Sequence, residues 1–468
     1  MIGELADGIG SRVGAMGRQV TGRFFDPTLR LGVTGLSRAG KTVFITSLVA
    51  NLLDRGRMTG LRAAADGAIQ AAYLQPQPDD TLPRFDYETH LDAMTGPNPH
   101  WPESTRAISE LRLSLRVQPT GLIAGLRGPK VLHLDIIDYP GEWLLDLALL
   151  EKSFDSWSEG ALERAGRRED GAAYLAQIKT ADPTKAFEIG QAKALAEAWT
   201  GYLRAAKDAG YSDCTPGRFL LPGEMAGSPA LTFAPLPPGA APRGSLRREF
   251  ERRFEAYKRE VVRPFFRAHF ARIDRQVVLV DALGAIHAGP QAVEDLRVAM
   301  ADILGAFRPG RNAFLTEIFR GKRVEKILFA ATKADHLHHA QHGRLTRIME
   351  ALVADAKSRA DYAGAKTAAM ALASLRATTE DRIEHGGELQ DVVRGVLADG
   401  RRAAFHPGEL PQDPRALLSQ GRRGAETWLD GDYAVMDIRP QGGALAPGEG
   451  PPHIRLDRAV EFLIGDRL

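Results

Sequence analysis

The chain has 468 residues, of which 44% are hydrophobic and 26% are charged, the ordinary range for globular proteins. This composition excludes wholesale disorder and supplies enough apolar material for a sizeable core. Lys and Arg total 61 against 59 Asp and Glu, so the net charge of +2 gives no overall attraction to nucleic acid. The single cysteine, Cys214, excludes a disulfide framework and any all-thiolate zinc site within the chain.

The first 25 residues predict a mildly amphipathic helix. Between residues 2 and 25, apolar positions recur at three- or four-residue steps among Arg12, Arg18 and Arg23. We expect this helix to pack on the body, with contact to a membrane surface as the alternative. The sequence lacks the run of about 18 apolar residues that would predict a membrane-spanning helix, and the N-terminus lacks the apolar core of a signal peptide. With one cysteine, these features predict a cytoplasmic protein, peripheral at the inner face of the membrane if the helix binds lipid.

The next elements alternate between strand and helix patterns. Residues 29–34 predict a strand and residues 43–53 a helix, with a glycine-bounded loop between them. Six prolines interrupt residues 55–107, which excludes a long element there. Residues 111–117 and 131–137 then predict two strands that form an antiparallel pair.

The second half of the chain contains a long helical stretch followed by a return to strands. Residues 143–272 have a period near 3.6, broken by a Pro/Gly-rich loop at 215–244, and predict a helical insertion. Later elements are strands at 277–281, 324–330 and 366–375, a helix at 295–307, a hairpin at 391–405 turning at Asp399-Gly400, a strand at 432–438 and a helix at 456–464. Strands alternating with helices predict an α/β core with a mostly parallel sheet.

Residues 35–42 match the pattern G-x-x-x-x-G-K-S/T completely. Gly35 and Gly40 let the loop curl around a triphosphate, whose oxygens need inward-facing N–H groups. Lys41 would neutralise β- and γ-phosphate oxygens, and the Thr42 hydroxyl would ligate Mg²⁺. An accidental glycine-rich turn is the alternative, but the strand before and the helix after favour a phosphate loop. The predicted binding residues are Gly35, Ser37, Arg38, Ala39, Gly40, Lys41, Thr42 and Val43.

A second motif, Asp138-Tyr139-Pro140-Gly141, follows the strand at 131–137. The Asp138 carboxylate is placed to hold Mg²⁺, commonly through water, and the Gly141 amide to meet the γ-phosphate. Asp135 differs from Asp138 by an odd number of positions, so the two side chains point to opposite faces and only one can be the metal residue. An ordinary turn is the alternative, which the upstream phosphate loop disfavours.

A third motif, Thr332-Lys333-Ala334-Asp335, follows the apolar strand at 324–330. A carboxylate here can accept hydrogen bonds from N1–H and the 2-amino group of guanine, whereas adenine lacks that donor edge. The Lys333 stem can lie over the ring. Ser374 lies where a further loop would reach guanine O6, although a buried strand end explains it almost equally well.

Three motifs in this order resemble the GTPase branch of P-loop proteins. The whole-chain pattern resembles the YcjX family of bacterial stress-associated P-loop proteins. The resemblance is carried by the helical insertion after the second motif and by the segments GLSRAGKTVFITSLVANLL, HWPESTR, DIIDYPGEWLLDL and ATKADH. The resemblance implies a Ras-like core that carries insertions and binds GTP or GDP.

The resemblance also identifies departures. Ser37 stands where many small GTPases prefer glycine, and Glu142 stands where they usually place a glutamine that orients water. Thr105 is our candidate for the first switch, closing on Mg²⁺ and γ-phosphate, with surface capping as the alternative. Arg38 or Arg106 could stabilise charge in the transition state, although a solvated arginine is the commoner role.

These inferences combine into one predicted organisation: a P-loop NTPase with a mostly parallel Ras-like sheet, a large helical insertion and a small β-rich C-terminal insertion. The predicted segments are the N-terminal helix at 1–28, the first part of the GTPase core at 29–142 including a switch I insertion, the helical insertion at 143–272, the second part of the core at 273–380, the β-rich insertion at 381–431, and a closing strand and helix at 432–468.

The predicted function is Mg²⁺-dependent GTP hydrolysis that acts as a nucleotide-controlled switch. Lys41, Gly141 and Glu142 are the predicted catalytic residues, and the helical insertion is the predicted contact for an unknown protein partner. A GTP- or GDP-binding scaffold with negligible turnover is one alternative. An ATPase or small-molecule kinase is the other.

Other clusters favour simpler interpretations. His336, His338, His339 and His342 crowd one segment, and the lack of an HExxH string or carboxylate arrangement favours a solvent-facing helix over a metal pair. Arginines and glutamates alternate over 247–267, which favours an exposed helix with ion pairs over a nucleic-acid footprint.

Overall fold

The computed structural model describes residues 26–36, 39–103, 107–118, 128–269, 272–305, 324–354, 357, 364–423, 437–443 and 445–468. The helix predicted at 2–25 lies outside these ranges, as does most of the strand predicted at 432–438. Three predicted site residues also lie outside them, namely Ser37, Arg38 and Thr105, together with Arg106.

The centre of the molecule is a seven-stranded sheet in the order β2-β3-β4-β1-β5-β6-β7. Strands β4, β1, β5, β6 and β7 run parallel, and β3 pairs antiparallel with both β2 and β4. The mostly parallel sheet and the antiparallel β3–β4 pair are confirmed, while β2 was not predicted. The strands are β1 (Thr28–Gly35), β2 (Ile69–Gln75), β3 (Ser109–Val117), β4 (Lys130–Asp138), β5 (Arg275–Val280), β6 (Lys326–Ala331) and β7 (Lys366–Ala371).

Helices cover both faces of this sheet because strand side chains alternate between them. On β5, Val277 and Leu279 enter the core beneath one set of helices, and Val278 and Val280 enter the core on the other side. The first face packs against α2 (Lys41–Leu53) and α18 (Leu456–Ile464), with α3 (Arg62–Ala65) and α4 (Tyr87–Thr95) nearby. The second packs against α12 (Ala282–Ala288), α13 (Pro290–Gly305), α15 (His342–Leu352) and α17 (Pro414–Arg423).

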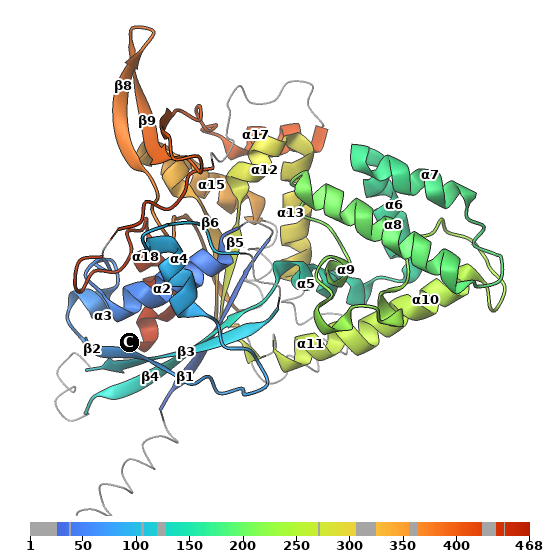
Figure 1. Ribbon diagram of the computed structural model, residues 1–468, viewed down its shortest axis with the longest axis horizontal. Coiled ribbons are helices and arrows are strands. Elements are labelled where there is room, and N and C mark those ends of the chain that lie inside the picture. The colour runs from blue at the N-terminus through green and yellow to red at the C-terminus, as the bar shows by residue number, and fades with distance from the viewer. Residues whose placement is uncertain are drawn as a thin grey trace, which may run out of the picture.

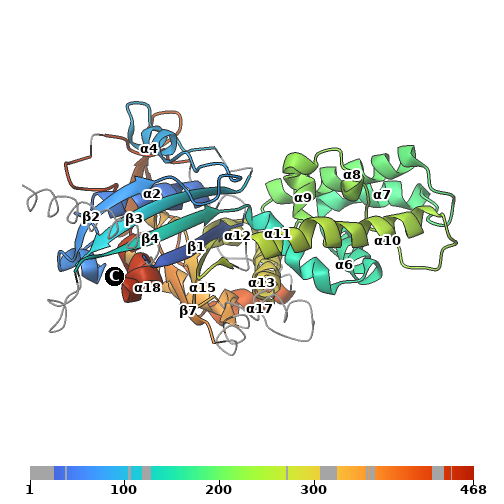
Figure 2. The same ribbon diagram turned by 90° about the horizontal axis from the view of Figure 1, so that it is seen from below.

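A helical lobe lies beside the sheet in both views (Figures 1 and 2). Its centre is a cluster of buried aromatic rings that includes Trp157, Trp199 and Phe254, with Trp157 stacked 5.0 Å from Phe254. The same continuous core includes the sheet residues Ile327 and Phe329, so the lobe and the sheet share one hydrophobic core. Its helices are α5 (Gly141–Leu145), α6 (Phe154–Arg167), α7 (Ala172–Thr180), α8 (Ile189–Asp208), α9 (Gly217–Leu220), α10 (Leu246–Tyr257) and α11 (Arg263–Ala268), with a π turn at Lys258–Val262.

The arginine-rich helix differs in part from the prediction. Arg248 pairs with Glu251 at 2.7 Å, and Glu249 pairs with Arg252, as expected of an exposed face. Arg247 and Arg253, however, are buried. The predicted exposed face with ion pairs is therefore present, but these two arginines depart from the prediction because their side chains pack into the lobe.

A second sheet of β8 (Thr379–His385), β9 (Glu388–Val396) and β10 (Arg402–Phe405) projects from the body (Figure 1). The hairpin turning at Asp399-Gly400 is confirmed, and Gly400 has the positive φ of 87° that such a turn requires. Strand β8 was not predicted, and α17 lies inside the segment expected to be β-rich.

Short 3₁₀ turns connect the longer elements. They are η2 (Asp146–Glu151), η3 (Glu169–Gly171), η4 (Gly223–Met225), η5 (Pro229–Leu231), η8 (Ala334–His336), η9 (His339–Gln341) and η10 (Gly465–Arg467).

Candidate nucleotide-binding site

A cavity of about 710 Å³ opens where the parallel strands end. Its walls include residues that follow β1, β5, β6 and β7, which is the edge where open α/β sheets bind ligands. The phosphate loop and the base-reading loop, roughly 300 residues apart in sequence, both line it. The predicted site residues in its lining are Ala39, Gly40, Lys41, Thr42, Val43, Glu142, Thr332, Lys333, Asp335 and Ser374, whereas Gly35, Asp138 and Gly141 are not part of it.

The phosphate loop turns directly into a buried helix. Gly40 precedes α2 with φ 79°, a left-handed conformation that glycine adopts without strain. The Lys41 ammonium donates to the Gly35 carbonyl at 3.0 Å, so this cation is held over the loop that would surround the phosphates. Since α2 is buried along most of its length, its N-terminus is fixed relative to β1.

Asp138 ends β4, opposite Val33 of the neighbouring parallel strand β1. This register places its buried carboxyl beside the strand that leads into the phosphate loop. Asp135 faces elsewhere, because Arg112 donates two hydrogen bonds to it at 2.6 and 2.8 Å. As expected, the side chains of Asp135 and Asp138 therefore have different surroundings. Metal binding by Asp138 stays a prediction.

Gly141 lies against the phosphate loop. A Cβ at this position would stand 2.1 Å from the Gly35 carbonyl oxygen and 3.2 Å from the Leu36 nitrogen, so only glycine fits the present backbone. Two loops that are more than 100 residues apart in sequence thus meet backbone to backbone.

Glu142 forms a buried ion pair with the helical lobe. Lys207 of α8 donates to its Oε1 at 2.7 Å, and both residues line the cavity. Burial by itself would raise the pKa of Glu142, but the nearby Lys41 and Lys207 lower the pKa of this carboxyl below its ordinary value. Glu142 is therefore ionised at neutral pH and well suited to accept hydrogen bonds, though weak as a proton acceptor.

The residues after Gly141 are held by the lobe through several contacts. Asp146 accepts hydrogen bonds from the Gly217 amide at 2.7 Å and from the Tyr257 hydroxyl at 2.5 Å. The Arg218 guanidinium stacks 3.2 Å from the centre of the Trp143 ring. These contacts join the segment after Gly141 to α9 and α10.

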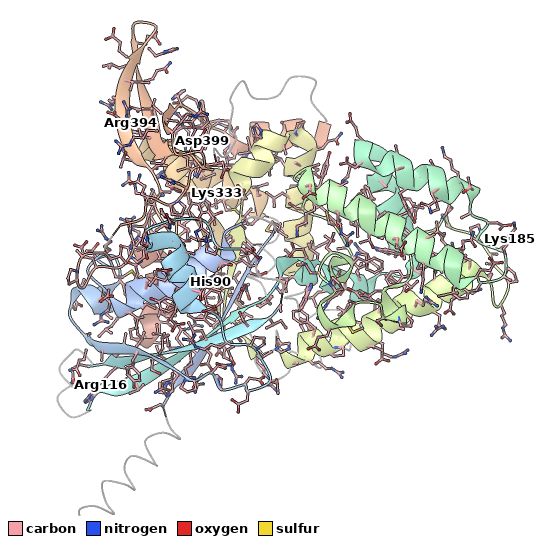
Figure 3. The ribbon with its side chains drawn as sticks, viewed as in Figure 1. His90, Arg116, Lys185, Lys333, Arg394 and Asp399 are labelled. Atoms are coloured by element: carbon pink, nitrogen blue, oxygen red, sulfur yellow. The ribbon has the colours of Figure 1, made fainter. Side chains whose placement is uncertain are left out.

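The base-reading loop is tightly fixed. Lys333 has a left-handed φ of 60°, and its ammonium pairs with Asp281 at 2.5 Å. Asp335 is buried, and its Oδ2 accepts from the Ala377 amide at 2.9 Å. Figure 3 places Lys333 between α2 and the projecting β8–β9 hairpin.

Motif reading missed several residues of the cavity wall. Lys207 belongs to a helix that carries no motif, so the sequence held no signal for it. Asp281 was predicted as a strand end, and an acidic residue at the carboxyl end of a parallel strand was an available signal. Trp101 also lines the cavity, where its indole N–H donates to the Ile438 carbonyl at 2.7 Å.

The prediction of a solvent-facing histidine helix is wrong. His336, His338 and His342 are buried, and the first three histidines precede α15. His342 is within hydrogen-bond distance of the Ala334 and Leu337 carbonyls, so it fixes the loop. Carboxylates, expected to be absent, lie beside His338 and His339.

Cys214 lines the cavity but is buried. Burial raises the pKa of its thiol, which disfavours a reactive thiolate. Its position within the packed core fits a structural role.

The glycine-bounded loop between β1 and α2, at the carboxyl edge of a mostly parallel sheet, defines a P-loop NTPase fold. Comparison with known proteins narrows this class: residues 29–468 match the model of the YcjX-like family, DUF463, and the chain belongs to that family. A protein of Escherichia coli K12 named Ras-like GTPase YcjX is 38% identical over 462 residues, covering 95% of this chain and 97% of the relative. A protein of Shewanella oneidensis MR-1 with the same name is 32% identical over 473 residues, covering 95% and 96%.

Across the portion of the chain that the structure describes, no helix combines the length and the apolar character needed to span a bilayer.

Proposed function

We propose that this protein binds GTP with Mg²⁺, hydrolyses it to GDP and phosphate, and acts as a nucleotide-controlled switch. The observation that carries the proposal is the shared cavity, whose walls hold the phosphate loop and the base-reading carboxylate together. A stress-related task is the expectation that the family resemblance adds.

The phosphate end of the site would be formed by Lys41 and the loop amides. The donor set offered to a cation consists of the Thr42 hydroxyl and the Asp138 carboxylate, which are hard oxygen ligands of the kind that Mg²⁺ prefers. These residues therefore fit the ion, which would supply charge neutralisation at the β- and γ-phosphates. Thr105 stays a proposed further ligand, since it lies outside the described residues.

The base end would be formed by Lys333 and Asp335. Because Oδ2 of Asp335 accepts from Ala377, this carboxylate is oriented and cannot rotate without losing a hydrogen bond. An oriented carboxylate complements the N1–H and 2-amino donors of guanine and repels the acceptor edge of adenine.

Hydrolysis requires water to attack the γ-phosphorus in line with the departing GDP. We assign Gly141 to contact with the γ-phosphate through its amide and Glu142 to orientation of the attacking water. Since Glu142 is paired with Lys207, turnover depends on how this pair is arranged when nucleotide is present. The contacts of Asp146 and Trp143 would then carry the change to the lobe, where a protein partner would detect it.

Nucleotide competition tests base selection. The wild-type chain should prefer GTP to ATP by at least 100-fold. The Asp335→Asn variant should retain its acceptor oxygen toward Ala377 and present an amide N–H to the base, so it should lose guanine preference and gain affinity for xanthosine triphosphate. Asp399→Asn, at the exposed hairpin turn, is the matched control and should behave as wild type. Equal affinity for GTP and ATP, unchanged in the variant, would eliminate guanine selectivity and favour the ATPase or kinase alternative.

Single-turnover hydrolysis tests the reaction. We expect phosphate release that Lys41→Ala abolishes. Tight GTP binding without phosphate release would instead support the scaffold alternative. The Glu142–Lys207 ion pair also favours this alternative, because a carboxylate paired with Lys207 is less available to orient water.

A further inference from the structure

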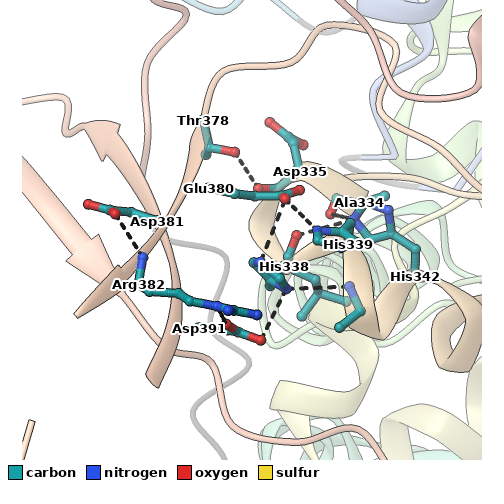
Figure 4. A network of polar contacts seen from close by, with 12 residues as sticks. Ala334, Asp335, His338, His339, His342, Thr378, Glu380, Asp381, Arg382 and Asp391 are labelled. Atoms are coloured by element: carbon teal, nitrogen blue, oxygen red, sulfur yellow. Dashed lines mark hydrogen bonds and ion pairs between the residues drawn. The ribbon is translucent and has the colours of Figure 1, made fainter. Parts of the chain in front are cut away.

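His338 and His339 lie where the base-reading loop meets strand β8 (Figure 4). His338 is buried, whereas the side chain of His339 is 68% exposed. The two rings lie 4.2 Å apart, centre to centre. Neither side chain has a role in the proposed nucleotide chemistry.

Glu380 of β8 presents one oxygen to both histidines. Its Oε2 lies 2.6 Å from Nδ1 of His339 and 3.7 Å from Nε2 of His338. Its other oxygen, Oε1, lies 3.4 Å from the Arg376 guanidinium. The arginine thus fixes the carboxylate so that a single oxygen faces the two imidazoles.

We propose that His338, His339 and Glu380 form a binding site for a divalent transition-metal ion of the Zn²⁺ class. Their ligand atoms all lie within 4.8 Å of one another, and a tetrahedral Zn²⁺ site requires roughly 3.3 Å between ligand atoms. Small movements of the exposed His339 side chain would meet that requirement. The exposure of His339 also leaves room for water at the fourth position.

Asp391 of β9 supplies the arrangement that commonly supports a metal-bound histidine. Its Oδ2 lies 3.4 Å from Nδ1 of His338, while its Oδ1 accepts from Arg382 at 2.7 Å. A proton on Nδ1 directed at Asp391 leaves the Nε2 lone pair facing Glu380, where the ion would lie. The Ala340 amide lies at the same distance from Nδ1, 3.4 Å, so a proton on Nδ1 requires His338 to release this backbone contact in favour of Asp391.

The ion would connect the base-reading loop to the projecting sheet. His338 lies three residues after Asp335, and the Thr378 hydroxyl already donates to the Asp335 carbonyl at 2.5 Å. Metal binding would therefore stabilise the junction that positions the base-reading carboxylate. This site does not depend on the proposed GTP hydrolysis and is tested apart from it.

Cobalt titration of the full chain, freed of nucleotide and treated with a chelator, tests the site. We expect one equivalent of Co²⁺ to give the visible absorption of tetrahedral coordination, and Zn²⁺ to displace it. His339→Ala and Glu380→Gln should lose this signal, and Asp391→Asn should bind about 10–100-fold more weakly. His385→Ala, an exposed histidine on the same strand, is the matched control and should bind as wild type.

Two results would overturn the proposal. One is the absence of stoichiometric Co²⁺ binding by the wild-type chain. The other is unchanged binding by both His339→Ala and Glu380→Gln. Since the His339 side chain is exposed, its variant should melt as wild type in chelator, so loss of binding would report on the ligand and not on the fold.

Discussion

The contact between Gly141 and the phosphate loop leads to a specific prediction for Gly141→Ala. A Cβ placed on the present backbone would lie 2.1 Å from the Gly35 carbonyl oxygen, and real Cβ contacts are essentially never under 3.0 Å. The two loops must therefore separate by most of an ångström. Overpacking of this kind usually costs about 1–3 kcal/mol of folding stability.

The same displacement should affect one nucleotide more than the other. If the Gly141 amide contacts the γ-phosphate, moving it removes a hydrogen bond to a charged group, worth about 1.5–3 kcal/mol. That loss corresponds to roughly 10–150-fold weaker binding of a non-hydrolysable GTP analogue. GDP lacks the γ-phosphate, so its affinity should change little.

Calorimetric titration of both nucleotides against wild type and variant measures this difference. Gly201→Ala is the control, because no atom of the described residues lies within 4 Å of its added Cβ, and it should stabilise α8 by up to about 1 kcal/mol. Equal weakening of GDP and the GTP analogue would refute the reasoning, since it would mean that the phosphate loop itself had been distorted. Unchanged affinity for both would show that Gly141 has no contact with the γ-phosphate.

Three further variants test the contacts between the site and the lobe. Lys207→Ala should lower the free energy of unfolding by about 2–3 kcal/mol in urea titrations, because it leaves the Glu142 carboxylate buried without this partner. Combining Glu142→Gln with Lys207→Met should recover most of this loss, because no unpaired charge is then buried. If the double variant does not recover stability, Lys207 acts through packing. Burial raises the pKa of Asp146 from 3.8 to about 7, so its contribution to stability is fully present below pH 4 and is lost as pH rises through 7. Asp146→Asn should therefore gain stability relative to wild type over that interval, by a few kcal/mol; a pH-independent difference would contradict the assignment.

The sequence alone determined those elements that can be recognised from one continuous stretch of residues. The phosphate loop needs eight adjacent residues, and apolar alternation over 111–117 predicted β3 because side chains on a strand point alternately to its two faces. Strand β8 could not be recognised from an apolar pattern, because its residues 379–385 (TEDRIEH) are mostly polar. They are polar because the sheet projects into solvent. Strand β2 carries too little alternation to be recognised.

The tertiary structure alone decided which distant side chains meet. Lys207 reaches Glu142 across 65 positions, and Glu380 reaches His339 across 41, with no motif to mark either pair. The histidines were predicted to face solvent because a helical period was assumed where the chain forms short 3₁₀ turns. The order of the motifs along the chain predicted that the phosphate loop and the base-reading loop form one site, because parallel strands bring their carboxyl ends to one edge of the sheet. Contacts between an insertion and that edge depend on how the insertion folds back, which local pattern does not encode.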